Sequence, residues 1–436
     1  MEAMMKRVVI LGACILSMVG CVPLPLPPQP PTSEALTPVP VVTETPTAVP
    51  SVVPTTMNQP SLTIWWPDVL MPTQDDQPLP LYEHLVAFAQ TENGVSVKVR
   101  IKRVSDVGGI MSTLRTAREV APSALPDMTL LRRQDLLDAV QRGLVQPLDG
   151  LVPTSMIDDL YEGVLQLGLV QPLPNEASRL YGFPYSLNFN HLVYESAYPL
   201  ESSSYDAFFD NEIPLVLSTQ EVTAGINPVF LTQYLQAGGR VNADGTLHID
   251  ENALSETLRF YEEATKLGLI HPLALQVASS VDLAVNIEQR GFGAAVVDSS
   301  LYLSLEKRGL KIASLPTHNG SIATFLDGWM WVVITQDSSQ QQVAIDLLAW
   351  MVNFEQQSEL LRLLNVVPAQ RATSRNTYGE DYDAFVARLL PEAQIPMSIG
   401  NGTGRARALQ SAFMAVVSGE QSSQVAVQSV LSQFPN

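Results

Sequence analysis

The 436-residue sequence has little cysteine, little positive charge and no long apolar segment. Both cysteines lie within the first 21 residues, so the rest of the chain has no thiol for a disulfide, a metal cluster or a catalytic nucleophile. Lysine and arginine number 25 against 44 aspartates and glutamates. The resulting net charge of −19 excludes nucleic acid as an expected partner. No apolar run reaches the ~20 residues that a membrane-spanning helix needs.

Signatures of several enzyme classes are also missing. The sequence has no Gly-x-Ser-x-Gly, no His-Glu-x-x-His and no phosphate-binding Walker loop, and its five histidines are scattered. A calcium loop near Asp244 and Gly245 would need a carboxylate where Arg240 stands, so a turn between two strands is predicted there instead. We therefore expect no catalytic residues, no metal ion and no other cofactor.

The N-terminus has the layout of a secretory signal. Lys6 and Arg7 precede an uncharged segment, Val8 to Gly20, and Cys21 follows directly. The segment 17–21, Ser-Met-Val-Gly-Cys, resembles the lipobox of bacterial lipoproteins, in which the cysteine becomes the lipidated first residue. This resemblance predicts a lipoprotein signal peptide over residues 1–20 and lipidation of Cys21. The alternative is an ordinary signal peptide that is cleaved elsewhere.

A proline-rich segment follows the predicted lipidation site. Residues 22–60 hold twelve of the 32 prolines and no aromatic residue, so they cannot form a hydrophobic core. Proline at this density favours extended conformations. We predict that residues 21–60 form a disordered spacer between the lipid and a folded domain.

Strand-like and helix-like patterns alternate from residue 62 onward. Apolar strands are predicted at 62–66, 95–101 and 126–131, and amphipathic helices follow each of them. Farther along, a helix is predicted to begin at Asp250 or Asn252, and strands are predicted at 292–297 and 329–334. Such alternation is typical of a mostly parallel sheet with helices on its faces. Ligands of these sheets bind beyond the carboxyl ends of the strands.

The order of several short motifs resembles a known family. The motifs are Leu-Thr-Ile-Trp-Trp at 62–66, Leu-Pro-Asp-Met-Thr-Leu at 125–130, Gly-Leu-Val-Gln-Pro-Leu-Asp at 143–149, Leu-Tyr-Gly-Phe-Pro-Tyr at 180–185 with Asn190 and Tyr194, Asn-Ala-Asp-Gly-Thr-Leu-His-Ile-Asp at 242–250, Gly-Phe-Gly-Ala-Ala-Val at 291–296, and Phe-Leu-Asp-Gly-Trp at 325–329. Together they cover nearly all of residues 61–436. The sequence resembles the extracellular solute-binding proteins (family 1) of ABC importers, particularly maltose- and oligosaccharide-binding lipoproteins.

The resemblance implies an α/β fold of the two-lobed, periplasmic-binding-protein type (type II), with the ligand cleft between the lobes. Lobe one is expected to comprise residues 61–185 plus 318–366, and lobe two residues 186–317 plus 367–436. Three hinge crossings are expected near 181–190, 311–318 and 366–370, each of which contains a proline.

The resemblance also implies a function. It implies a monomeric binding protein without enzymatic activity that closes on a mono- or oligosaccharide and delivers it to an ABC permease. The expected location is the extracellular face of the bacterial cytoplasmic membrane, through the N-terminal lipid, or the periplasm. Two alternatives stay open. One is a binding protein for a peptide, a polyamine or an organic anion, and the other is a secreted enzyme that acts on glycans.

Candidate ligand contacts follow from the predicted strand ends and, for Tyr185 and Asn188, from the first expected hinge crossing. Indole rings stack on the flat faces of sugars, while planar polar groups bind the hydroxyls. Alternation along a strand places one residue of a Trp-Trp pair in the core. We therefore expect at least one of Trp65 and Trp66, and also Trp329, to face the cleft. Trp331 and Trp350 are predicted to be core or helix-packing residues. For the polar candidates, the competing interpretation is a solvated loop position, and Arg132 with Arg133 and Asp135 could form an exposed charged group. The candidates are Trp65, Trp66, Asp68, Arg132, Tyr185, Asn188, Asp298, Ser299, Asp327 and Trp329.

Overall fold

The computed structural model describes residues 61–434 except 72–78, 92–94, 106, 174–175, 221, 224, 243–245, 278–279, 285–286, 288–291, 306–308, 376 and 396–402. Internal contacts divide the chain into Met1–Thr55 and Thr56–Asn436, and the elements below belong to the second unit. The predicted signal peptide, Cys21 and the spacer lie outside the described residues.

Strands and helices alternate at the start of the fold, as predicted. Strand β1 pairs in parallel with β2 on one side and β3 on the other, because each connecting helix returns the chain to the end of the sheet at which β1 begins. These elements are β1 (Ser61–Pro67), α1 (Leu79–Thr91), β2 (Ser96–Lys102), α2 (Ile110–Val120), β3 (Met128–Arg132) and α3 (Arg133–Gln141).

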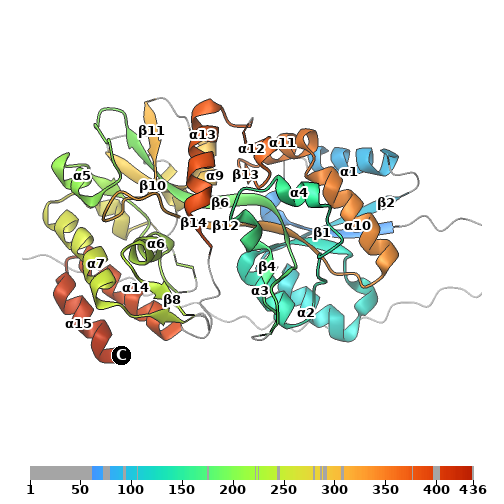
Figure 1. Ribbon diagram of the computed structural model, residues 1–436, viewed down its shortest axis with the longest axis horizontal. Coiled ribbons are helices and arrows are strands. Elements are labelled where there is room, and N and C mark those ends of the chain that lie inside the picture. The colour runs from blue at the N-terminus through green and yellow to red at the C-terminus, as the bar shows by residue number, and fades with distance from the viewer. Residues whose placement is uncertain are drawn as a thin grey trace, which may run out of the picture. The chain divides into compact units, whose positions relative to one another are not determined.

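One mixed sheet runs through the second unit (Figure 1), with the strand order β2-β1-β3-β12-β6-β10-β7. Strand β12 is antiparallel to β3 and β6, and β6 is antiparallel to β10, whereas β10 and β7 are parallel. Three short strands, β11, β13 and β14, pair with β6 or β12 off this path. The bounds are β6 (Phe183–Glu195), β7 (Leu215–Val216), β10 (Ala294–Asp298), β11 (Leu310–Ala313), β12 (Thr324–Val333), β13 (Val367–Pro368) and β14 (Ala393–Gln394).

Strand β6 connects the two ends of this sheet. Its first half pairs with β12 and β13, and its second half pairs with β10 and β11. The register against β12 shifts between Trp329 and Met330, which leaves Tyr185 as an extra residue next to Pro184. Proline lacks an N–H for the ladder, so a bulge is where a strand accommodates it. The first predicted crossing, 181–190, therefore lies largely within one continuous strand.

Strand β12 approaches β6 closely at Gly328, which lies opposite Leu187. A Cβ atom at position 328 would lie 2.2 Å from the carbonyl oxygen of Ser186. Only glycine fits this contact without moving the backbone.

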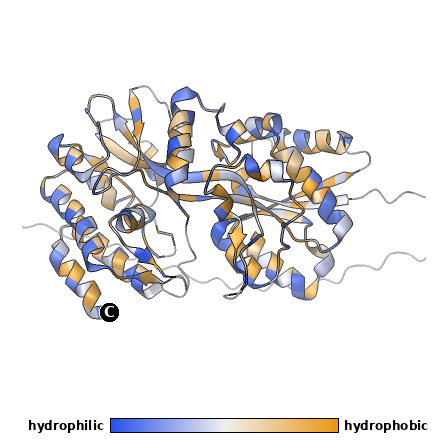
Figure 2. Cartoon of the chain, viewed as in Figure 1, coloured by the Kyte–Doolittle hydropathy of each residue, from blue (hydrophilic) through white to orange (hydrophobic). Residues whose placement is uncertain are grey.

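Two hydrophobic clusters hold the helices to the sheet. Hydrophobic and hydrophilic residues alternate along these helices (Figure 2). The first contains the β1–β3 region with α10, α11 and α13, and the second contains α6, α7, α14 and α15. Asp250 caps α7 as predicted, since its Oδ1 accepts a hydrogen bond from the N–H of Ala253. These helices are α6 (Pro228–Gln236), α7 (Glu251–Lys266), α10 (Ser338–Met351), α11 (Phe354–Leu363), α13 (Glu380–Leu389), α14 (Thr403–Val417) and α15 (Ser423–Gln433).

The remaining elements are short. The two strands around the predicted turn at 244–245 are present and antiparallel, while the turn itself lies outside the described residues. Among the helices of the described residues, none is long and apolar enough to cross a membrane. The short elements are α4 (Thr154–Asp158), β4 (Leu169–Val170), β5 (Arg179–Leu180), α5 (Tyr205–Asp210), β8 (Arg240–Val241), β9 (Leu247–His248), α9 (Ser299–Ser304) and α12 (Arg371–Ser374).

Candidate ligand-binding site

A solvent-accessible polar strip crosses the middle of the sheet. Nearly every residue of β6 and β12 is buried, but Asn188, Asn190 and Asp327 are partly exposed in the interior of these strands. Asp298, the last residue of β10, is also partly exposed. Their neighbours Leu187, Phe189, His191 and Leu326 are each at most 2% exposed. Solvent therefore reaches one face of these strands, and that face is polar.

The register places these side chains on the same face. Asp327 lies directly opposite Asn188, and Asn190 lies directly opposite Asp298. Residues two apart along a strand share a face, so Asn188 and Asn190 connect the two pairs. We call these four residues, together with Arg132, the polar floor.

Arg132 joins the polar floor from the neighbouring strand. It is the last residue of β3 and lies opposite Trp329. Its guanidinium Nη2 lies 3.1 Å from Asp327 Oδ2, and its Cζ lies 5.7 Å from the centroid of the Trp329 ring. Because both charged side chains are partly open to solvent, the pair contributes little to stability and serves to orient the two groups.

Ser299 fixes the orientation of Asn188. Its hydroxyl donates a hydrogen bond to Asn188 Oδ1 at 2.9 Å, and the N–H of Phe189 donates to Ser299 Oγ at 3.4 Å. Asp298 begins α9, and its Oδ1 accepts from the N–H of Leu301 at 2.8 Å. The amide and carboxylate are therefore held by short local contacts, as a preorganised binding site requires.

Comparisons with known proteins identify the family of the chain. A family model described as bacterial extracellular solute-binding protein matches residues 83–382. The chain belongs to this family. A search of curated proteins finds no match.

Solved structures of solute-binding proteins show the same fold. Maltose-bound MalE3 of T. maritima is 15% identical, with a TM-score of 0.62, over 86% of this chain and 98% of that one. The cyclic alpha-maltosyl-1,6-maltose binding protein of Arthrobacter globiformis is 17% identical, with a TM-score of 0.63, over 85% and 96%. The sugar-binding protein MalE of Xanthomonas citri is 17% identical, with a TM-score of 0.65, over 86% and 96%. The predicted periplasmic-binding-protein-like fold is confirmed.

The two tryptophans at the end of β1 are less exposed to solvent than expected for residues of a solute-binding cleft. Trp65 is 1% exposed and Trp66 is 0% exposed, so the prediction that at least one indole is accessible is wrong for this structure. Both faces of a parallel sheet are covered by helices, so alternation along β1 does not bring either side chain to solvent. Lys102 Nζ lies 4.6 Å from the centroid of the Trp65 ring.

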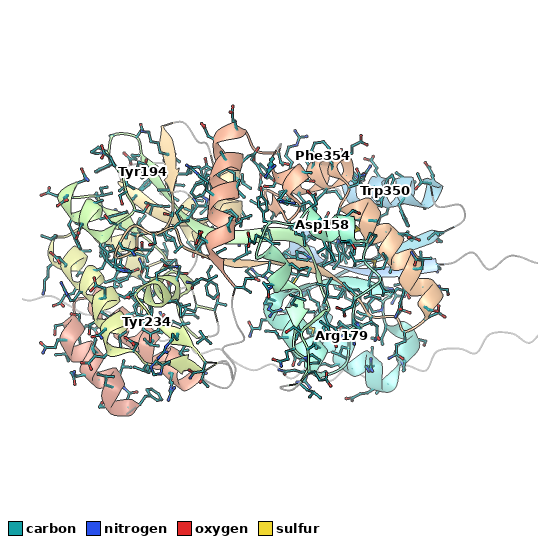
Figure 3. All side chains as sticks on the ribbon, in the orientation of Figure 1. Asp158, Arg179, Tyr194, Tyr234, Trp350 and Phe354 are labelled. Atoms are coloured by element: carbon teal, nitrogen blue, oxygen red, sulfur yellow. The ribbon has the colours of Figure 1, made fainter. Side chains whose placement is uncertain are left out.

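Trp66 nevertheless shares a face with the polar floor. Its ring meets Trp331 edge to face at 5.6 Å, and Trp331 lies on the same side of β12 as Trp329 and Asp327. The Trp66 Nε1–H donates to the carbonyl of Leu70 at 2.6 Å. Trp331 is buried, and Trp350, which is labelled in Figure 3, packs against Phe88, as predicted for both tryptophans.

Three other candidates lie apart from the solvent-accessible strip or beneath its surface. Tyr185 is fully buried and packs edge to face against Trp331, and burial raises the pKa of its hydroxyl. Asp68 is exposed and begins a short 3-10 helix after β1. Trp329 is only 8% exposed, in contrast to the expected open indole, with the Arg132 guanidinium near its ring.

Arg133 has a different role from the exposed pair considered for it. Its Nη1 donates to the carbonyl oxygens of Leu167 and Leu169 at 2.8 and 2.7 Å, and burial lowers its pKa to about 10. Asp135 follows in the same helix, and burial raises its pKa, whereas the nearby Arg132 lowers it. Arg133 therefore anchors the segment before β6, and Arg132 alone of the two faces the site.

Asn190 is the residue of the polar floor that sequence reasoning missed as a ligand contact. Its carbonyl accepts a hydrogen bond from Thr324 Oγ1 at 2.7 Å, which holds the backbone in place. Its position two residues after Asn188 in a predicted extended segment was an available signal, because period-two spacing places both amides on one face.

Proposed function

We propose that this solute-binding protein is the substrate-binding component of an ABC importer and that its ligand is a carbohydrate. The observation that carries the proposal is the polar floor, a solvent-accessible row of carboxylate, amide and guanidinium groups in the middle of an otherwise buried sheet. The three structural neighbours described above are named for maltose or other sugars, which supports a carbohydrate ligand.

The chemistry of the polar floor fits hydroxyl groups. Asp327 accepts hydrogen bonds, Arg132 donates them, and the amide of Asn188 can donate because its oxygen already accepts from Ser299. The charges of Arg132 and Asp327 compensate each other, so a neutral ligand leaves no charge unpaired there. A binding role without catalysis needs only these contacts.

Ligand capture is proposed to proceed by closure of two lobes. Ligand contacts from both sides would shift the equilibrium toward the closed state. The proposed lobes are residues 61–185 plus 318–366 and residues 186–317 plus 367–436.

The N-terminal region completes the proposal. Cys21 would carry the lipid anchor, residues 22–60 would hold the domain away from the membrane, and a permease would receive the ligand from a monomeric binding protein. Membership of an extracellular family implies a location outside the cytoplasm. Attachment to the outer face of the cytoplasmic membrane is the proposed form of that location.

A thermal-shift screen of residues 61–436 tests the ligand class. Panels of saccharides, peptides, polyamines and organic acids are compared, since a ligand that binds only the folded state raises the melting temperature. We expect stabilisation by saccharides, and Asp327→Asn and Arg132→Gln should each weaken the identified saccharide at least about tenfold. The exposed Asp206→Asn is the matched control. Stabilisation by peptides, polyamines or organic acids alone would refute the carbohydrate assignment.

A further inference from the structure

The edge strand β2 and the helix after it carry an excess of positive charge. Residues 95–118 contain six of the 25 lysines and arginines but only one of the 44 aspartates and glutamates. Strand β2 is the first in the sheet order and pairs with β1 alone among the described strands (Figure 1). An acidic chain therefore has a local region of opposite sign along one edge of its sheet.

Four of these basic residues form a strip along β2. Lys98, Arg100 and Lys102 occupy every second position of the strand, so their side chains share one face. The valines on the opposite face pack against the first hydrophobic cluster. Arg103 follows the strand directly, and it is exposed, as are Lys98 and Arg100, while Lys102 is half-buried. We call Lys98, Arg100, Lys102 and Arg103 the basic strip.

The basic strip has no anionic partner in the described part of the chain. The nearby Arg115 pairs with Asp138 at 2.8 Å, but no ion pair among the described residues includes a member of the strip. Lys102 Nζ lies 4.6 Å from the centroid of the Trp65 ring, which holds this ammonium group in place. The charges of the strip are therefore available to attract an anion from outside the described chain.

Protection of the sheet edge is a competing explanation for these charges. Charged side chains on an edge strand prevent it from pairing with a second copy. That role requires charge but not a particular sign, and acidic residues outnumber basic ones in this chain. Two copies paired along β2 would also bring like charges together. The uniform positive sign of the strip therefore favours an anionic partner.

We propose that the basic strip contacts the anionic phospholipid headgroups of the membrane outside which the protein works. This inference rests on the proposed location at the outer face of the cytoplasmic membrane. At physiological ionic strength, charges more than about 8 Å from the contact are largely screened. The strip at the contact therefore outweighs the more numerous acidic residues farther away, and each of its cations adds to the attraction.

The position of the strip suits a tethered protein. Strand β1 begins at Ser61, which pairs with Ser96 at the start of β2, so the predicted spacer leads into the strand next to the strip. A tether attached there raises the effective concentration of the strip at the membrane surface. Strands β1 and β3 separate β2 from β12 by about 14 Å, so the contact does not involve the polar floor.

Cosedimentation with lipid vesicles tests the contact. The protein is the mature chain with Cys21→Ser, so that no acyl chain contributes, and the vesicles contain phosphatidylcholine alone or phosphatidylcholine with an equal amount of phosphatidylglycerol. At about 0.05 M salt we expect binding to the anionic vesicles to be at least about tenfold tighter, and at about 0.5 M salt we expect this preference to disappear. The triple change Lys98→Gln, Arg100→Gln and Arg103→Gln should abolish the preference.

Two controls separate the strip from net charge and from folding. The triple change Arg259→Gln, Lys311→Gln and Arg388→Gln removes the same charge from exposed positions on other elements, and it should retain the preference. Arg100→Lys with Arg103→Lys keeps the charge of the strip and should bind as wild type does. The strip variants should keep the wild-type melting temperature and saccharide affinity, because the replaced side chains are exposed and make no ion pair within the described chain.

Each outcome of the vesicle experiment is decisive. Equal binding to the two kinds of vesicle, or an equal loss in the strip triple variant and the control triple variant, overturns the proposal. Neither result affects the thermal-shift assay, so failure here is distinguishable from failure of the carbohydrate assignment. Because salt removes the contact of the strip, membranes washed at about 0.5 M salt hold the protein through its lipid alone, and release of the Cys21→Ser protein from them still tests lipidation.

Discussion

The buried histidine of β6 gives a prediction of how stability depends on pH. His191 is fully buried among aromatic rings, with the ring of Tyr302 at 5.0 Å and that of Phe385 at 5.4 Å. The Tyr382 hydroxyl lies 3.5 Å from its Nε2, and its Nδ1 lies 3.2 Å from the carbonyl oxygen of Leu192. Burial lowers the pKa of His191 to about 4, although the Leu192 carbonyl and the Asp298 carboxylate act in the opposite direction.

The sign of the effect follows from proton binding. Between pH 6.5 and pH 4 the unfolded chain binds a proton at this histidine and the folded chain does not. The free energy of unfolding therefore falls as the pH falls through this interval, and the contribution of His191 reaches about 3 kcal/mol at pH 4. Below pH 4 the folded protein is protonated as well, and the loss from this group stops.

Urea unfolding at pH 7, 6, 5 and 4 measures this contribution. His191→Phe keeps an aromatic ring in the cluster and removes the titration, so its stability relative to wild type should improve by about 3 kcal/mol from pH 7 to pH 4. Using the difference from wild type removes the contribution of the carboxylates, which titrate in both proteins. Tyr302→Phe, a change in the same cluster, should show a constant difference. A difference for His191→Phe that stays within about 0.5 kcal/mol across this range would refute the reasoning.

Three other changes have defined outcomes. Trp66→Ala removes a buried indole, so it should lower the free energy of unfolding by about 3 to 5 kcal/mol in urea denaturation. An unchanged free energy of unfolding would contradict the burial of Trp66 against Trp331. Gly328→Ala should abolish saccharide binding and lower the melting temperature, since its Cβ would meet the Ser186 carbonyl. Gly404→Ala is the control, because its Cβ would meet no atom nearer than 3.7 Å, and it should leave binding unchanged. Cys21→Ser should move the protein from the membrane fraction to the aqueous fraction with an unchanged melting temperature, and retention in membranes would reject the lipidation site.

The parts of the fold that local patterns determine were predictable. The strand at 62–66, the helices after each early strand and the Asp250 cap of α7 depend on alternation and capping within a few residues, and all are present. The burial of both Trp65 and Trp66 was not predictable, because it depends on helices that cover both faces of β1.

The residues of the candidate site likewise divide into those that local patterns identify and those that depend on tertiary contacts. Strand-end reasoning identified Arg132 and Asp327, and the first expected hinge crossing identified Asn188. The register brings the three together, but pairing between β12 and β6 has no local signal. Arg133 could not be distinguished from Arg132 by composition, since its partners are the backbone carbonyls of Leu167 and Leu169. Such contacts depend on tertiary structure alone.

The long central strand also has a consequence for the order of folding. Asp327 and Asn188 are neighbours in the sheet but lie roughly 140 positions apart in the chain, and contacts of such separation make folding slow. During synthesis, β6 emerges long before β12, so its first half has no partner strand from β12 until the chain has passed residue 333. A freshly made chain therefore remains unfolded for longer than a helical protein of the same length, and a mutation that weakens the β12 and β6 pairing should lengthen that interval further.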